Sequence, residues 1–350
     1  MSLVNLIRLL TRPLNRNREA SLSKFALKAD KSPMTAARIS APISELHERL
    51  DAFRKSAAQV ILDKDREIAL TLCCLIADGH LLIEDVPGVG KTTLVKTLSR
   101  LMNLESSRIQ FTNDMLPADI LGSSIFDESK KAFIFHRGPI FAQMVLADEL
   151  NRATPKTQSA CLQAMEERRV TVDGITHSLP SPFFLIATQN PRQQVGTFPL
   201  PESQLDRFLM RVELGYPSRQ AEKALLLGQS RLSMVEDLEP VFSPSDLQDV
   251  QRVAKTVHVS EHIVGYIQDL VAKTRENVAM GRGLSPRGSL CLVHAAQAWA
   301  LLQRRSMVLP EDVQAVALSV MSHRLNPVDD LAGETGVRIA EDILASVRVD

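Results

Sequence analysis

The chain has 350 residues, of which 45% are hydrophobic and 23% charged, a composition typical of a soluble globular protein with about two domains. Its net charge is zero and its aromatic content is only 4%, which argues against a nucleic-acid-binding protein that relies on a basic surface and stacking rings. The four cysteines form no Cys-x-x-Cys pair, which excludes a zinc ribbon and a thioredoxin-type motif and favours reduced, buried thiols in a cytoplasmic protein. No apolar run reaches the ~18 residues that a membrane-spanning helix needs.

Residues 1–36 form a basic N-terminal extension, which we expect to be disordered. Seven basic side chains in its first part stand against only two acidic ones, Glu19 and Asp30. A basic amphipathic anchor on a membrane surface is the alternative, because three apolar side chains share one helical face: Leu3, Ile7 and Leu10.

Residues 37–219 alternate between helical and extended patterns, which predicts an α/β domain with a parallel sheet covered on both faces. A helix is predicted over 55–78, where an apolar face continues with few helix breakers. Five short apolar runs are predicted as buried strands: 80–84, 108–111, 144–147, 183–188 and 208–214. Further helices are predicted over 91–102 and 155–168.

Residues 220–350 contain no strand pattern, so we predict an all-helical second domain. Apolar residues recur at helical spacing from Leu247 to Val257. Pro310 followed by two acids is typical of a helix start, since acids are favoured at the positive end of the helix dipole. The remaining helices are predicted over 261–275, 287–303 and 310–321.

A phosphate-binding loop is predicted where the first strand runs through a glycine-containing turn into a helix. Two glycines allow backbone N–H groups to turn inward around phosphates, and the helix start adds its positive end. Lys91 can reach the β- and γ-phosphates, and the Thr92 hydroxyl can bind Mg²⁺. Asp85 replaces the first glycine of the usual motif, a change we expect to be tolerated at the opening of the loop. The predicted nucleotide-binding residues are Val86, Pro87, Gly88, Val89, Gly90, Lys91, Thr92 and Thr93.

Two later strands end in polar residues that suit ATP hydrolysis. The strand over 144–147 runs into Asp148, which would hold Mg²⁺ together with Thr92, and Glu149, which would orient and polarise the attacking water. The strand over 183–188 is followed by Asn190, a candidate water-orienting residue. Asn-Pro alone is typical of an ordinary turn, so this assignment depends on the other motifs.

The ordered set of motifs resembles the MoxR family of AAA+ ATPases over about residues 43–330. The motifs that carry the resemblance are Pro-Gly-Val-Gly-Lys-Thr from Pro87, Leu-Ala-Asp-Glu-Leu-Asn-Arg-Ala from Leu146, Ala-Thr-Gln-Asn-Pro from Ala187, Leu-Pro-Glu-Ser-Gln-Leu-Asp-Arg-Phe from Leu200, and Gly-Leu-Ser-Pro-Arg from Gly283. The resemblance implies an AAA+ αβα core with a five-stranded parallel sheet, followed by an all-α lid. It also implies a ring, usually hexameric, with ATP at the subunit interfaces.

The family pattern assigns roles to further arginines. Arg207 matches the arginine finger that reaches a neighbour's γ-phosphate and stabilises the charge that develops there. A surface salt bridge with Glu202 or Asp206 is its alternative. Arg287 matches sensor 2, which would contact nucleotide in the same subunit and couple it to the lid. Arg152 is a further candidate for facing the neighbouring subunit.

Two β-hairpins are predicted as insertions, one over 122–138 and one over 169–179 with its turn at Asp173 and Gly174. In the related proteins such insertions lie near the pore or the substrate face, which would make them client-binding elements.

The function expected is Mg-dependent ATP hydrolysis by a chaperone-like ring that remodels or matures a partner protein. The resemblance implies a partner with a von Willebrand A domain. Two alternatives are a nucleic-acid translocase and a nucleotide switch that does not hydrolyse ATP. The neutral charge argues against the first, and the intact Lys91, Asp148, Glu149 and Arg207 argue against the second.

Overall fold

The computed structural model describes residues 43–189, 196–228, 230–276, 283–325 and 334–348. Its centre is a five-stranded sheet in the order β2-β5-β8-β1-β9, in which every neighbouring pair is parallel. The strands are β1 (Leu81–Glu84), β2 (Ser106–Gln110), β5 (Met144–Asp148), β8 (Phe184–Gln189) and β9 (Met210–Val212). All five predicted strands and the predicted parallel sheet are confirmed.

Side chains alternate between the two faces of this sheet, as the strand period of two requires. In β5, Met144 and Leu146 belong to one core cluster, whereas Val145 and Ala147 belong to another. The first cluster includes helices α3 (Ile43–Val60), α4 (Asp65–Ile76) and α5 (Lys91–Leu101). The second includes α6 (Pro117–Leu121) and α7 (Pro155–Glu167). The inner strands β5 and β8 are buried almost throughout because both faces of the sheet are covered, whereas the edge strand β2 is polar and largely exposed.

The prediction of one helix over 55–78 is wrong, because a turn at 61–64 separates α3 from α4. Asp63 in this turn has φ 60°, in the left-handed region. Its carboxylate accepts a hydrogen bond from the Ser218 amide at 3.3 Å, and the Lys64 ammonium donates to the Tyr216 carbonyl at 3.1 Å. The apolar pattern continues through the turn, so periodicity alone does not mark it.

The C-terminal part is helical, as predicted, and its first helices contact the α/β part directly. The amides of Val241 and Phe242 donate to the Leu101 carbonyl at 2.8 and 3.0 Å, and Gln251 donates to the Leu75 carbonyl at 2.9 Å. The predicted helices correspond to α11 (Pro244–Ala254), α12 (Glu261–Glu276), α13 (Pro286–Leu302) and α14 (Pro310–Met321). The patterns did not predict α6, α9 (Arg219–Leu227), α10 (Arg231–Glu236) or α15 (Glu334–Ser346), and a short helix α8 (Glu202–Leu205) precedes Arg207. Short 3-10 helices are η2 (Leu150–Arg152) and η4 (Ser322–Arg324).

The domain boundaries at 36/37 and 219/220 stay predictions, and the basic extension lies outside the described residues. No helix in the described part of the chain is long and apolar enough to cross a membrane.

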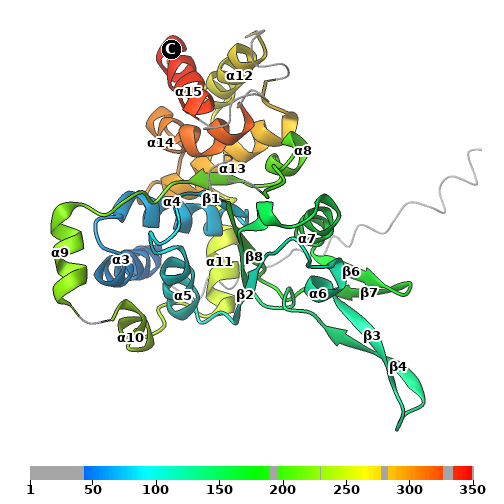
Figure 1. Ribbon diagram of the computed structural model, residues 1–350. Helices are drawn as coiled ribbons and strands as arrows, with labels where there is room; N and C mark the ends of the chain where they lie inside the picture. Colours follow the sequence, from blue (N-terminus) through cyan, green and yellow to red (C-terminus); the bar gives the residue numbers. More distant parts are fainter. Residues whose placement is uncertain (1–42, 190–195, 229, 277–282, 326–333, 349–350) are drawn as a thin grey trace, which may run out of the picture. The chain divides into compact units, whose positions relative to one another are not determined.

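Both predicted hairpins are present. The first pairs β3 (Gly122–Asp127) with β4 (Ala132–Arg137), and the second pairs β6 (Arg169–Val172) with β7 (Ile175–Ser178). Asp173 and Gly174 have φ values of 51° and 77°, the left-handed conformation that a two-residue hairpin turn favours. Figure 1 shows β3 and β4 projecting away from the central sheet.

His80 lies buried immediately before β1 and is held there as a neutral ring. Its Nδ1 accepts a hydrogen bond from the Leu185 amide at 3.1 Å, and the ring contacts Phe183 and Phe184. Burial lowers the pKa of His80 to about 3, with the nearby Arg168 adding to the shift and Asp78 opposing it. The unfolded chain therefore binds a proton at His80 between about pH 6.5 and 3 that the folded chain does not bind.

We expect the melting temperature to fall as the pH is lowered from 7 to 5, because protonation of His80 in the unfolded state favours unfolding. One such group contributes at most ~1.4 kcal/mol per pH unit within this window. His80→Gln keeps a hydrogen-bond acceptor but does not titrate, so its melting temperature should decline less steeply with pH. Scanning calorimetry at several pH values measures both slopes. Equal slopes for the two proteins would show that His80 does not contribute.

Candidate functional site: a phosphate-binding loop at the carboxyl edge of the sheet

The predicted phosphate-binding loop connects the end of β1 to the start of α5. Gly88 and Gly90 have φ values of 88° and 99°, which only glycine adopts readily, and no atom lies within 4 Å of a Cβ built at either position. Gly90 is the residue before the first turn of α5, so the loop presents the positive end of that helix. The Lys91 ammonium is buried and donates to the Asp85 carbonyl at 2.6 Å.

The departure from the usual motif at Asp85 has a structural role. The buried Asp85 carboxylate accepts hydrogen bonds from the amides of Leu214 and Gly215, both at 2.7 Å, and from the Val86 amide at 2.8 Å. The first two amides follow β9, so this carboxylate ties the start of the loop to the neighbouring strand. Glycine at position 85 has no side chain that could form these contacts.

We expect Asp85→Gly, which restores the usual motif, to weaken ATP binding and lower the melting temperature. Three amide donors would lose their acceptor, and each buried donor left unpaired costs about 1–3 kcal/mol. If ~1.4 kcal/mol or more of this cost falls on the nucleotide-binding conformation of the loop, the affinity for ATP drops roughly tenfold or more. Titration with a fluorescent ATP analogue and a thermal melt measure the two effects. Asp85→Asn, which keeps one carbonyl oxygen, should be milder, whereas wild-type behaviour of Asp85→Gly would contradict this role.

The two predicted acidic residues lie at the end of β5, beside the loop. Asp148 Oδ1 accepts a hydrogen bond from the Thr188 hydroxyl at 2.6 Å, and that hydroxyl accepts one from the Glu149 amide at 2.8 Å. Glu149 has φ 57°, a left-handed conformation that is rare for a residue with a side chain. Thr188 therefore fixes both acidic residues from the adjacent strand. The sequence patterns did not identify Thr188, although it lies only two residues before Asn190.

Three further side chains contact the acidic pair. Arg108 donates to Asp148 Oδ2 with Nε at 3.1 Å and Nη2 at 2.6 Å. Gln110 donates to Glu149 Oε2 at 3.2 Å, and Arg152 Nε lies 2.9 Å from the same oxygen. Arg108 and Gln110 are two residues apart on β2, so they lie on the same face of that strand. The period of two in β2 is the sequence signal that could have identified them.

These groups enclose a cavity of about 330 Å³, lined by Pro87, Gly88, Gly90, Lys91, Thr92, Arg108, Gln110, Asp148 and Glu149. Of the other predicted loop residues, Val89 packs against the core, the Val86 amide binds Asp85, and the Thr93 carbonyl accepts from Thr97 at 2.8 Å. The loop is open, and the positive end of α5 and the buried ammonium fit the phosphates of a nucleotide. Thr92 and Asp148 place a hydroxyl and a carboxylate in the same cavity, the hard oxygen ligands that Mg²⁺ prefers.

Burial lowers the pKa of Lys91, while the negative charges of Asp85, Asp148 and Glu149 oppose that shift. The ammonium thus lies near three carboxylates and donates to the Asp85 carbonyl, within the cavity where a phosphate would bind.

Arg207 and Arg287 contact the same carboxylate. Arg207 Nε lies 2.9 Å from Glu166 Oε2, and Arg287 Nη2 pairs with Glu166 Oε1. The ion pair of Arg207 is therefore with Glu166 rather than with Glu202 or Asp206. The sequence patterns did not identify Glu166, which lies in the last turn of α7 and is 121 residues from Arg287.

This arginine pair lies at the opposite edge of the sheet from the cavity. Leu209 donates its amide to the His80 carbonyl at 2.8 Å, and Met210 pairs with Leu81, so Arg207 lies beyond the start of β1. The loop follows the end of β1, and parallel strands gather their ends at one edge. The structure brings together Lys91, Thr92, Asp148 and Glu149, but it does not bring Arg207 or Arg287 to them. Asn190 lies outside the described residues, so its role stays a prediction.

Comparisons with known proteins match both the α/β part and the helical part of the chain. Residues 80–210 match the ATPase family associated with various cellular activities (AAA), and residues 272–343 match the AAA lid domain. The uncharacterized protein YeaC of Bacillus subtilis is 45% identical over 308 residues, which cover 87% of this chain and 96% of that protein. Chaperone MoxR1 of Mycobacterium tuberculosis is 39% identical over 277 residues, covering 76% of this chain and 73% of that protein. A crystal structure of a candidate ATPase from Cytophaga hutchinsonii superimposes with a TM-score of 0.78 and 32% identity, covering 88% of this chain and 97% of that one.

Proposed function

Because this chain belongs to the MoxR family of AAA+ ATPases, we propose that it hydrolyses ATP with Mg²⁺ and uses the reaction to remodel or mature a partner protein. The observation that carries the proposal is the single cavity in which Lys91, Thr92, Asp148 and Glu149 meet. The relative named a chaperone supports the remodelling role.

Each residue of the cavity has a distinct task in this proposal. The loop amides around Gly88 and Gly90 bind the phosphates, and Lys91 binds the β- and γ-phosphates. Thr92 and Asp148 would hold Mg²⁺, which neutralises charge on these phosphates when it is bound. Glu149 orients the attacking water and accepts its proton. Arg108 is half-exposed, so its side chain can rotate from Asp148 toward a bound phosphate.

The active unit is a ring, which we propose to be a hexamer with ATP between subunits. The arginine pair lies across the sheet from its own cavity, so within one subunit the transition state lacks these cations. A neighbouring subunit that presents this edge to the cavity would supply Arg207 as the finger. Arg287, expected to contact nucleotide in its own subunit, is assigned instead to the neighbour's nucleotide, because it shares Glu166 with Arg207.

The hairpin of β3 and β4 is the proposed client-binding element. It exposes Ile125, Phe126 and Phe133, and the two phenylalanine rings contact each other with their centroids 5.4 Å apart. Exposed aromatic side chains of this kind are typical of protein-binding surfaces. The client proposed from the family resemblance is a protein with a von Willebrand A domain.

The proposed location is the cytoplasm, because the free cysteines fit a reducing compartment.

An ATPase assay of the purified full-length chain tests the function. We expect phosphate release that requires Mg²⁺ and does not change on addition of DNA. Stimulation of hydrolysis by single- or double-stranded DNA would favour the translocase instead. No hydrolysis at protein concentrations at which the ring has formed would favour a nucleotide switch. A pull-down with the Glu149→Gln protein, which should hold ATP and remain bound to its client, identifies the partner.

A further inference from the structure

We propose that Arg324 is a positioning residue that holds Arg207 and Arg287 together as one unit facing the neighbouring subunit. The inference rests on the proposed function, because it concerns how the finger is kept in place. Arg324 ends the 3-10 helix η4 in the lid, and only 3% of its side chain is exposed.

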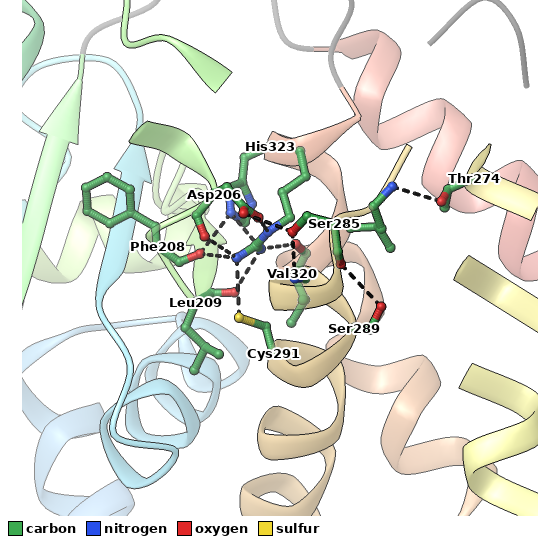
Figure 2. A network of polar contacts seen from close by, with 12 residues as sticks. Asp206, Phe208, Leu209, Thr274, Ser285, Ser289, Cys291, Val320 and His323 are labelled. Carbon is green, nitrogen blue, oxygen red and sulfur yellow. Dashed lines mark hydrogen bonds and ion pairs between the residues drawn. The ribbon is translucent and has the colours of Figure 1, made fainter. Parts of the chain in front are cut away.

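The first step is the contact between Arg324 and the segment that carries Arg207. Its Nε donates to Asp206 Oδ1 at 2.8 Å. Its Nη2 donates to the carbonyls of Asp206 and Phe208 at 3.1 and 2.5 Å, and its Nη1 donates to the Leu209 carbonyl at 3.2 Å. One guanidinium group therefore binds the backbone on both sides of Arg207 (Figure 2). Arginine suits this task because its five donors have a fixed planar arrangement.

The second step connects the same carboxylate to the lid helix that carries Arg287. The Ser285 hydroxyl donates to Asp206 Oδ2 at 2.9 Å and accepts from the Gly288 amide at 3.1 Å, which caps α13. Arg287 is the second residue of that helix. Asp206 is thus bound by Arg324 through one oxygen and by the start of α13 through the other. Figure 2 shows Asp206 beside Ser285 in this network.

The third step is the close packing around the guanidinium group. Gly288 faces Arg324, and a Cβ at this position would lie 3.3 Å from the Arg324 Cδ and 2.8 Å from a Leu284 methyl group. The Cys291 sulfur lies 3.4 Å from Nη2. The network therefore leaves little room for Asp206 or Ser285 to shift without the other. Lid movement is transmitted to Arg207 through this network, even though Arg324 contacts neither nucleotide nor Arg207.

The test uses Arg324→Lys in the full-length chain, because lysine keeps the charge but loses the planar fork. We expect the Kd for ATP to stay within about twofold of the wild-type value and kcat to fall at least about tenfold. The fall is smaller than the roughly 10³–10⁵-fold contribution of an arginine finger, because Arg207 is displaced but still present. Mixing this variant with inactive Glu149→Gln subunits should raise the activity, because those subunits supply a correctly held Arg207. Asp206→Asn, a smaller change, should behave in the same way if Arg324→Lys fails to fold.

Arg305→Lys is the matched control, because Arg305 is another lid arginine that pairs with an aspartate, the fully buried Asp312, but has no contact with residues 206–209 among those described. Its kcat should remain that of the wild type. Equal losses in Arg324→Lys and Arg305→Lys, or no rescue of Arg324→Lys while Arg207→Ala is rescued, would overturn the positioning role and leave the proposed function intact. If Arg207→Ala is not rescued either, the trans finger itself fails, and the positioning role fails with it.

Discussion

Glu149→Gln is expected to bind ATP with wild-type affinity and to hydrolyse it at least about 100-fold more slowly, the lower range for loss of a general base. Glu149 lines the phosphate cavity, and its amide is fixed by Thr188 at 2.8 Å, so the backbone position should survive the substitution. The amide of glutamine keeps the shape but cannot accept a proton from water. Steady-state phosphate release and binding of a fluorescent ATP analogue measure the two quantities.

Lys91→Ala is the matched variant in the same cavity, and it should lose ATP binding itself. The Lys91 ammonium is buried and donates to the Asp85 carbonyl, so its charge lies in the loop where phosphate would bind. Near wild-type turnover of Glu149→Gln would show that Glu149 does not activate the attacking water. Normal ATP binding by Lys91→Ala would show that the loop is not the ATP-binding element.

Arg207→Ala is expected to bind ATP and to lose about 10³–10⁵-fold in kcat, the range of arginine fingers. The loss should be large although Arg207 lies at the opposite edge of the sheet from its own cavity, because it acts on the neighbour's nucleotide. For the same reason, wild-type activity per subunit should rise with protein concentration as rings form. Measuring kcat across a dilution series, with the oligomeric state followed by light scattering, checks both results.

The control for this variant is Arg169→Ala. Arg169 is an exposed arginine near the end of α7 that pairs with Glu167 at 3.1 Å, so it resembles Arg207 in charge and in having a glutamate partner. Its removal should leave kcat unchanged. Activity per subunit that stays constant down to a proven monomer would contradict the trans mechanism.

Features set by local sequence were predicted well. The strands β1, β5 and β8 were identified because each is a short run rich in apolar residues, and the loop because glycines at 88 and 90 meet a lysine at a helix start. The hairpin turn at Asp173 and Gly174 was identified for the same kind of reason, since it depends on two adjacent residues.

Features set by distant contacts were not predicted. The carboxylate of Asp85 binds amides 129 and 130 residues away, so the sequence showed only a missing glycine. Glu166 brings Arg207 and Arg287 together across 121 residues, and no spacing rule connects them. The role of Arg324 depends on carbonyls 115 to 118 residues away, and its own surroundings read as the end of an ordinary helix.

The break between α3 and α4 is a third kind of case. Asp63 has a left-handed conformation there, and its carboxylate accepts a hydrogen bond from the Ser218 amide, 155 residues along the chain. Apolar periodicity is preserved on both sides of the turn, so a helix pattern alone predicts one helix where the structure has two.

We propose that a complete site needs Glu149 from one subunit and Arg207 from the next. Mixing Arg207→Ala with Glu149→Gln subunits tests this requirement, because each protein alone lacks one of the two groups. We expect the mixture to hydrolyse ATP well above the sum of the two separate activities, since some interfaces pair an intact Glu149 with a neighbour's intact Arg207. A mixture that remains at that sum, in rings shown to contain both subunits, would contradict it.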